Sequence, residues 1–212
     1  MYGTKWAPKE LNVVIIIQPN YLLGDVEFIK HHNWTKINKA FSNEFCNSLL
    51  NFYPDPVVVD YVGKRDGAND IRTFVTREKT PEFAKLFDNW NTAVARLYFT
   101  QLSGVDCMKG KLRIEACQDG PGFFLENHID IPEKLLTLQI YLGEGDSNWG
   151  TSLYNDDQTL HHLVEFKHNT GYLFSKTSQL IHGVQRGVVS GLRRSILINY
   201  VVGDWKDTDQ LY

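Results

Sequence analysis

The stretch Phe124–Gly145, FLENHIDIPEKLLTLQIYLGEG, places a histidine and an aspartate just ahead of a run that is typical of a buried strand. His128 and Asp130 are separated by a single residue. Imidazole and carboxylate groups that enter a core must be paired or put to use, because burying them without a partner costs free energy. The rest of the sequence must therefore supply either their partner or their use.

The composition is that of an ordinary globular protein without a surplus of positive charge. The 212 residues are 42% hydrophobic and 22% charged, with a formal net charge of −3 and a pI near 6.2. A single domain is expected, because barrels and sandwiches of this length are usually single units. Nucleic acid is not expected as a partner, because binding a polyanion requires a basic surface.

Three cysteines, Cys46, Cys107 and Cys117, are an odd number and lack the spacing of zinc ligands. They are expected to be buried thiols in a reducing compartment rather than a disulfide framework or a metal site. No apolar run approaches the length of a membrane span, and the N-terminus lacks a secretory pattern. We therefore expect a soluble, cytoplasmic protein that does not bind membranes.

The N-terminal half is predicted to be mainly helical. Ser42 is a candidate N-cap for a helix that ends before Pro54. A longer helix is predicted to follow Thr80, with Pro81 at its first position, and to end at Gly104. Its apolar residues recur at helical spacing and predict one buried face: Phe83, Phe87, Trp90, Val94, Leu97 and Tyr98. Short strands are predicted at 12–17 and 57–62, and a loop, either a lid or an ordinary surface loop, at 63–70.

After Gly104 the pattern changes to short segments that are rich in β-branched and aromatic residues and separated by turns. Strands are predicted at 111–117, 122–130, 135–142, 151–155, 162–166, 171–175 and 193–202. Helices followed by many strands indicate a mainly β protein whose helices pack on one sheet. Residues 1–212 are expected to form one domain, with a helical N-terminal support at about 1–105 and a β core at about 106–203.

Three later residues supply a use for His128 and Asp130. His182 follows a predicted strand, and Arg193 and Ser195 come after it, separated by one residue. Two imidazoles and one carboxylate on one face of an octahedral ion leave three positions open, as a non-haem Fe(II) oxygenase requires. An arginine that enters a barrel needs an anionic partner, and a planar guanidinium suits a carboxylate.

This set, His128-x-Asp130…His182…Arg193-x-Ser195, resembles the 2-oxoglutarate/Fe(II)-dependent dioxygenases, whose core is a double-stranded β-helix (jelly-roll). The flanking segments DGPGFFLENHID, LTLQIYL and NTGYLFS…HGV are similar to the prolyl-hydroxylase-like branch, and the resemblance covers about 111–202. It implies that His128, Asp130 and His182 bind Fe(II). It also implies that the cosubstrate 2-oxoglutarate is held by Arg193, Ser195 and Tyr141, that O2 is the oxidant, and that no side chain acts as a catalytic acid or base.

The activity that the resemblance implies is hydroxylation, with release of succinate and CO2. Related halogenases have Ala or Gly at the carboxylate position, so Asp130 favours hydroxylation over halogenation. The substrate class stays open between a protein prolyl residue, a free amino acid and a small metabolite, because fold does not specify function. Two alternatives are a cupin-type metalloenzyme that does not use 2-oxoglutarate and an inert jelly-roll binding module.

Further residues are predicted to line the pocket. Thr137 and Gln139 alternate with apolar neighbours and share the side of Tyr141. Arg113 and Glu115 form either a surface ion pair, which contributes little, or substrate contacts inside the mouth of the barrel.

Arg194 is expected to face away from Arg193, although a single bulge in the preceding turn would exchange the two.

Overall fold

The computed structural model describes residues 33–53, 81–202 and 205, together with the backbone of 27–30 and 70–74. The strands predicted at 12–17 and 57–62, most of the predicted loop and the cap at Thr80 lie outside these residues. None of the described helices is long and apolar enough to cross a membrane.

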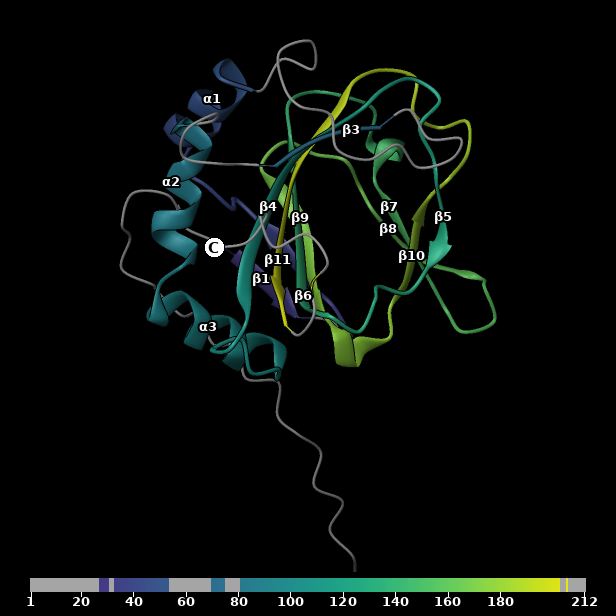
Figure 1. Ribbon diagram of the computed structural model, residues 1–212. Coiled ribbons are helices and arrows are strands. Elements are labelled where there is room, and N and C mark those ends of the chain that lie inside the picture. Colours follow the sequence, from purple (N-terminus) through teal and green to yellow (C-terminus); the bar gives the residue numbers. More distant parts are fainter. Residues whose placement is uncertain (1–26, 31–32, 54–69, 75–80, 203–204, 206–212) are drawn as a thin grey trace, which may run out of the picture.

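Two antiparallel sheets face each other and form a jelly-roll, as predicted (Figure 1). The larger sheet has the order β1-β2-β9-β6-β11-β4-β3. Its strands are β1 (Glu27–Lys30), β2 (Thr35–Asn38), β3 (Asp70–Phe74), β4 (Lys111–Asp119), β6 (Lys134–Leu142), β9 (Thr170–Ser175) and β11 (Arg193–Val201). The smaller sheet has the order β5-β10-β7-β8. Its strands are β5 (Leu125–His128), β7 (Thr151–Tyr154), β8 (Leu160–Val164) and β10 (Ile181–Val184).

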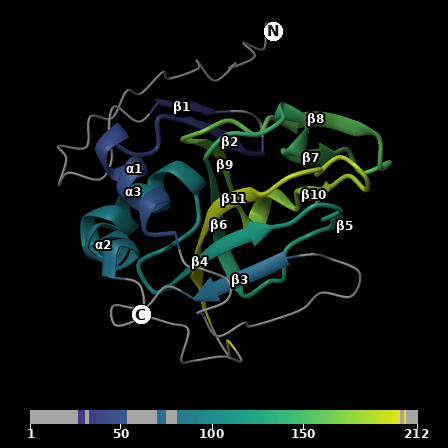
Figure 2. The same ribbon diagram turned by 90° about the horizontal axis from the view of Figure 1, so that it is seen from above.

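Three helices cover the outer face of the larger sheet: α1 (Asn43–Asn51), α2 (Pro81–Trp90) and α3 (Ala93–Ser103) (Figures 1 and 2). Ser42 caps α1 as predicted, and its hydroxyl accepts the backbone N–H of Phe45 at 3.2 Å. Cys46, Cys107 and Cys117 are buried and none of the three forms a disulfide, also as predicted. Two short 3-10 helices, Ser147–Trp149 and Lys176–Ser178, complete the described elements.

The central strands of the larger sheet separate an apolar core from a polar interior. Leu138 and Ile140 of β6 and Ile196 and Ile198 of β11 pack against the helices. The residues that alternate with them point between the two sheets, because successive side chains in a strand face opposite ways. The inner face therefore carries a set of buried polar side chains: Thr137, Gln139, Tyr141, Arg193, Ser195 and Asn199. β11 is buried along nearly its whole length, so it is covered on both faces.

The prediction of a single helix after Thr80 is wrong. The chain forms two helices there, and the second begins after Thr92. Thr92 has extended backbone, and its hydroxyl accepts the backbone N–H of Ala95 at 3.1 Å, so it begins a new helix. The break changes the direction of the apolar stripe. Val94 and Leu97 were predicted to be buried, but they are 68% and 52% exposed. Gly104 ends α3 in the left-handed conformation, with φ of 72°, as predicted.

Strand prediction succeeded for the strands of the larger sheet in the C-terminal half and for β7 of the smaller sheet, whereas β8 begins and ends two residues before the predicted 162–166. The strand predicted at 122–130 is shorter, because Gly120–Phe123 forms a turn in which the Phe123 N–H donates to the Gly120 carbonyl. The separate strand β10, which contains His182, was not predicted. The N-terminal half also supplies three strands of the larger sheet: β2 pairs with β9, β1 pairs with β2 at that edge, and β3 pairs with β4 at the other.

Candidate metal centre

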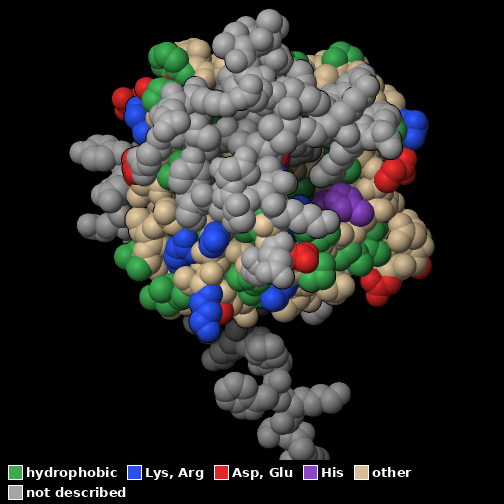
Figure 3. Space-filling model, in the orientation of Figure 1, with side chains coloured by type: hydrophobic (Ala, Val, Ile, Leu, Met, Phe, Trp, Pro, Cys, Tyr) green, Lys and Arg blue, Asp and Glu red, His purple; other side chains and the backbone are tan. Residues whose placement is uncertain are grey.

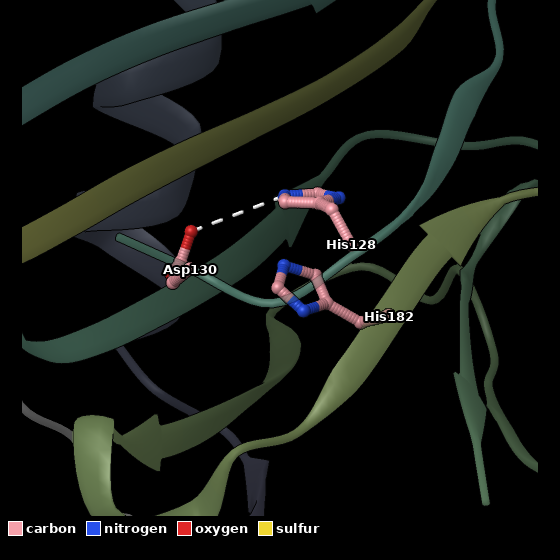
Figure 4. A group of neighbouring side chains, drawn as sticks. All are labelled: His128, Asp130 and His182. Carbon is pink, nitrogen blue, oxygen red and sulfur yellow. Dashed lines mark ion pairs between the residues drawn. The ribbon is translucent and has the colours of Figure 1, made fainter. Parts of the chain in front are cut away.

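The side chains of three residues converge on one point beside the smaller sheet: His128, Asp130 and His182 (Figure 4). One nitrogen or oxygen atom of each residue lies within 4.8 Å of the other two, and no other such cluster of three occurs among the described residues. His128 and His182 are direct cross-strand partners on β5 and β10, and their ring centroids are 4.3 Å apart. Asp130 follows β5 by two residues, so it returns to the same side as His128.

Gly183 allows the two histidine-bearing strands to approach closely. A Cβ atom at this position would lie 2.6 Å from the backbone oxygen of Leu125 and 2.7 Å from the side-chain oxygen of Asn127. Both atoms belong to the β5 strand that pairs with β10. A larger residue after His182 would therefore push apart the strands that bring the two imidazoles together.

Both imidazoles are oriented by a backbone carbonyl two residues earlier in the chain. The Nδ1 atom of His128 lies 2.9 Å from the oxygen of Glu126, and that of His182 lies 3.0 Å from the oxygen of Leu180. A carbonyl can only accept, so each Nδ1 carries a proton and Nε2 is the ring atom available to a metal. Metal-binding histidines commonly have this arrangement, in which an outer hydrogen bond fixes the tautomer and the ring orientation.

The protonation states suit a divalent cation. Burial lowers the pKa of His182 to about 4, so its ring is neutral near pH 7 and free to donate a lone pair. Burial by itself would raise the pKa of Asp130, but the Lys134 ammonium and other neighbours outweigh it and lower that pKa. The site therefore offers two imidazoles, of which that of His182 is neutral, and one carboxylate, a donor set that fits Fe(II) and leaves coordination positions open.

Two neighbours hold the Asp130 carboxylate. The Lys134 ammonium donates to Oδ1 at 2.6 Å, and the Thr137 hydroxyl donates to Oδ2 at 2.6 Å. His128 is the exposed member of the triad, with a side chain 33% exposed against 7% for Asp130. Histidine side chains reach the surface on the face drawn in Figure 3. Hydrogen bonds thus hold the Asp130 carboxylate on the buried side of the centre, and solvent reaches the centre on the His128 side.

Arg193 lies on the inner face at the end of β11 and is 1% exposed. Its Nε donates to the carbonyl of Trp149 at 2.6 Å, its Nη2 donates to the Thr151 hydroxyl at 3.3 Å, and its Nη1 donates to the carboxylate of Asp119. Burial by itself would lower the pKa of Arg193, but the Asp119 carboxylate, together with Tyr141 and Tyr172, outweighs it and raises that pKa. Arg193 is therefore a fixed cation in the interior.

Arg194 faces the opposite side of the larger sheet. Its guanidinium lies over the Tyr53 ring, 5.4 Å from the ring centroid, on the side covered by the helices. No bulge interrupts the pairing of this part of β11 with β4, so the two arginines alternate in the ordinary way. Of the two, Arg193 is the one in the interior.

A row of hydrogen-bonded side chains runs along the inner face of β6 between the triad and Arg193. The Tyr141 hydroxyl donates to the Thr151 hydroxyl at 2.7 Å. The Gln139 amide donates to the Ser195 hydroxyl at 2.8 Å and accepts from the Tyr172 hydroxyl at 2.8 Å. Tyr141 and Ser195, expected to bind the cosubstrate, therefore lie on the same surface as Gln139.

Tyr172 links the two ends of this surface electrostatically. Burial is the main cause that raises its pKa, the Asp130 carboxylate raises it further, and the Arg193 cation opposes the rise. Ring contacts connect the same two ends. The Arg193 guanidinium lies over the Tyr141 ring, which contacts Tyr172. Tyr172 stacks on Phe174, which contacts His182, so the triad and Arg193 belong to a single interior.

Arg113 and Glu115 also lie in this interior, so they are not the surface ion pair that the sequence allowed. Arg113 is 8% exposed and Glu115 is 4% exposed, and their charged groups are 2.8 Å apart. Arg113 donates to the Asn199 side chain at 3.2 Å, and Asn199 donates to the Thr137 hydroxyl at 3.0 Å. Hydrogen bonds thus connect this ion pair, through Thr137, to Asp130.

Sequence analysis missed Asp119, Lys134, Thr151 and Asn199, all of which contact predicted site residues. Asp119 stands directly opposite Arg193 in the pairing of β4 with β11. Lys134 follows Asp130 by four residues, which is a local signal that could have indicated the contact. Contacts of Thr151 and Asn199 depend on which strands are neighbours, which the spacing of residues along the chain does not reveal.

The sequence matches no protein-family model and no curated protein. The structure, in contrast, matches many solved structures. The chain has the same fold as solved structures that include prolyl hydroxylases and a member of the 2-oxoglutarate/Fe(II) oxygenase family.

Three solved structures illustrate the likeness. A prolyl-4-hydroxylase from Pseudomonas putida has a TM-score of 0.64 and 15% identity, and the match covers 81% of this chain and 94% of that one. A prolyl hydroxylase from Trichoplax adhaerens, in complex with a hypoxia-inducible-factor peptide fragment, has a TM-score of 0.62 and 15% identity, covering 80% and 83%. HygX from Streptomyces hygroscopicus, with nickel, 2-oxoglutarate and hygromycin B bound, has a TM-score of 0.57 and 13% identity, covering 80% and 82%.

Proposed function

We propose that this protein is an Fe(II)- and 2-oxoglutarate-dependent oxygenase that hydroxylates its substrate. One observation carries the proposal: His128, Asp130 and His182 meet at a single point in the interior that also contains the buried cation Arg193. A metal site alone would fit a cupin-type metalloenzyme equally well. The buried guanidinium on the same inner surface is what favours a dicarboxylate cosubstrate.

His128, Asp130 and His182 would hold the metal, with Thr137 and Lys134 fixing the carboxylate. The bound iron, with 2-oxoglutarate and O2, would supply the oxidation of a C–H bond, with release of succinate and CO2. The Nδ1 atoms of both imidazoles are held by backbone carbonyls, so both rings would present Nε2 to the metal. The protein contributes position, and no described side chain is needed as a proton donor or acceptor.

Arg193 would bind the distal carboxylate of 2-oxoglutarate. A guanidinium has five N–H donors, and three of those of Arg193 are used by Trp149, Thr151 and Asp119. Two donors thus remain for a ligand. Tyr141 and Ser195 lie on the same face as Arg193 and would complete the binding of this carboxylate.

The substrate would approach the metal from the exposed side of His128. The Trichoplax adhaerens prolyl hydroxylase was solved with a peptide fragment and HygX with hygromycin B, and both are structurally similar to this chain. A peptidyl residue and a small molecule are therefore both candidate substrates. Arg113 and Glu115 supply one charge of each sign near Thr137 and would contact the substrate rather than the cosubstrate.

A substrate screen that measures succinate formation tests the proposal. The screen would include peptides, free amino acids and small metabolites, with Fe(II) and 2-oxoglutarate present. We expect substrate-stimulated succinate release from the wild-type protein and none from Asp130→Ala, because that variant loses one of three protein ligands. Asp157→Ala is the matched control, since Asp157 lies in an exposed turn. Full activity of Asp130→Ala would refute the assignment.

A further inference from the structure

Asp119 is a buried carboxylate at the end of the interior where the cosubstrate is proposed to bind. It is fully buried, and its Oδ2 accepts a hydrogen bond from Arg193. Its other oxygen, Oδ1, is also buried and has no hydrogen-bond partner. Buried carboxylate oxygens are normally satisfied, so this atom marks a position where a hydrogen-bond donor is missing.

The positive charge of Arg193 is already balanced by Asp119. A dicarboxylate ligand that docks on Arg193 would bring a second negative charge to a site that holds only one described cation. An uncompensated charge in a protein interior is costly. Two carboxylates that share one site therefore resist being ionised together, and the pKa of one of them rises strongly.

The other groups around Asp119 do not remove this excess of negative charge. Tyr141 from β6 and Tyr53 from the segment after α1 are neutral phenols whose pKa values are raised, chiefly by burial. Cys117 is a buried thiol two residues away on β4. On β3, Asp70 pairs with Asp119 and Arg72 pairs with Cys117, so that strand adds one residue of each charge to the register.

We propose that 2-oxoglutarate takes up one proton when it binds, and that Asp119 and the distal carboxyl group of the ligand share this proton. The proposal rests on the proposed function. The proton comes from solvent and returns to solvent when the ligand leaves. The resulting O–H group supplies the donor that Asp119 Oδ1 lacks, while Arg193 keeps its hydrogen bond to Oδ2 and donates its remaining N–H groups to the ligand.

This coupling makes the affinity for 2-oxoglutarate depend on pH. We expect the Kd to rise about tenfold for each pH unit, because binding requires one proton. In Asp119→Asn the amide can donate to the ligand carboxylate directly. That variant should bind 2-oxoglutarate with little pH dependence, and more tightly than the wild type at the alkaline end of the range.

Calorimetry of the Fe(II)-loaded full chain under anaerobic conditions tests the proposal without turnover. 2-Oxoglutarate is titrated in buffers of different ionisation enthalpy, between about pH 6 and pH 8.5. The slope of the measured enthalpy against the buffer enthalpy counts the protons taken up. We expect about one proton per ligand for the wild type and about zero for Asp119→Asn. A keto acid without the distal carboxylate, 2-oxopentanoate, should give zero in both proteins.

Two results would overturn the inference. One is a wild-type binding enthalpy that does not depend on the buffer; this measurement needs no variant and is unaffected by any folding defect of Asp119→Asn. The other is an Asp119→Asn protein, folded by circular dichroism, that binds 2-oxoglutarate more weakly at every pH, since Asp119 would then only position Arg193. If the wild type binds Fe(II) but no 2-oxoglutarate, the proposed function fails and this inference fails with it.

Discussion

At the residue scale, the same local hydrogen bond orients the rings of both candidate histidine ligands. In each, the ring nitrogen Nδ1 bonds to the carbonyl two residues earlier, Glu126 for His128 and Leu180 for His182. The strand conformation places that carbonyl within reach and directs Nε2 toward Asp130. Asp130 differs, because side chains rather than backbone hold both of its oxygens.

Thr137 allows a direct test of this support. Thr137→Val removes the hydroxyl that donates to Asp130 Oδ2 and keeps the shape of the side chain. Loss of an outer hydrogen bond to a metal ligand typically weakens metal binding by about 10–100-fold, and we expect a fall in Fe(II) affinity within that range. Anaerobic competition with a chelator measures it. Thr137→Ser should keep wild-type affinity, and equal affinity of all three proteins would contradict the role given to the hydroxyl.

Replacing either of the two adjacent arginines by lysine should affect 2-oxoglutarate binding only at Arg193. Arg193→Lys replaces a guanidinium with three fixed partners by a single ammonium that cannot reach them all. We expect the Kd for 2-oxoglutarate to rise at least about tenfold, as measured by anaerobic calorimetry. Arg194→Lys is the matched control on the helix-covered face and should leave the Kd unchanged. A larger effect at Arg194 would contradict the assignment of Arg193.

Residue types and spacing were enough to predict the triad and Arg193, but not their partners. His-x-Asp, the distal histidine and Arg-x-Ser can each be recognised along the chain. Asp119 contacts Arg193 only because β4 and β11 are neighbours in this register. A pairing between residues 119 and 193 leaves no local pattern, so neither the buried ion pair nor its unpaired oxygen could be predicted.

At the element scale, the break at Thr92 decides how the helices cover the sheet. The apolar spacing of 81–104 is compatible with a single helix, and only the capping hydroxyl of Thr92 marks the interruption. The second helix then packs through Tyr98 and Phe99 and exposes Val94. Periodicity predicted where apolar residues recur, but it could not show that the helix axis changes direction between them.

Two variants of α3 separate these interpretations. Thr92→Ala removes the N-cap and should lower the free energy of unfolding by about 1 kcal/mol. Val94→Ala should change it by less than about 0.5 kcal/mol, because Val94 is exposed. Urea denaturation of both proteins checks the prediction. A single continuous helix with Val94 in the core would give the reverse order, with Val94→Ala the more damaging change.

At the scale of the whole molecule, folding and metal binding are expected to be separable. A large apolar cluster joins the three helices to β4, β6 and β11, and a second cluster lies between the sheets around Tyr141, Leu153 and Tyr172. Neither cluster includes the three candidate ligands. The jelly-roll should therefore stay folded without metal, and a metal should add only the stability that comes from its own binding.

Redox-inert Mn(II) measures this contribution. At a free concentration about one hundred times its Kd, Mn(II) should stabilise the wild-type protein by about 2.7 kcal/mol. Asp130→Ala should gain much less, because it lacks one ligand. Chemical denaturation with and without Mn(II) gives both values. Unfolding of the wild-type protein by a chelator alone, seen as loss of far-ultraviolet circular dichroism, would show that the metal is structural.

The most direct test of the central claim is an anaerobic titration of the protein with Fe(II) and then 2-oxoglutarate, followed by visible absorption. If both bind at one centre, a metal-to-ligand charge-transfer band should appear with one equivalent of each, and it should be lost in Asp130→Ala. Iron binding without this band would indicate a cupin-type site that does not use 2-oxoglutarate. Absence of iron binding would contradict the account and leave an inert jelly-roll.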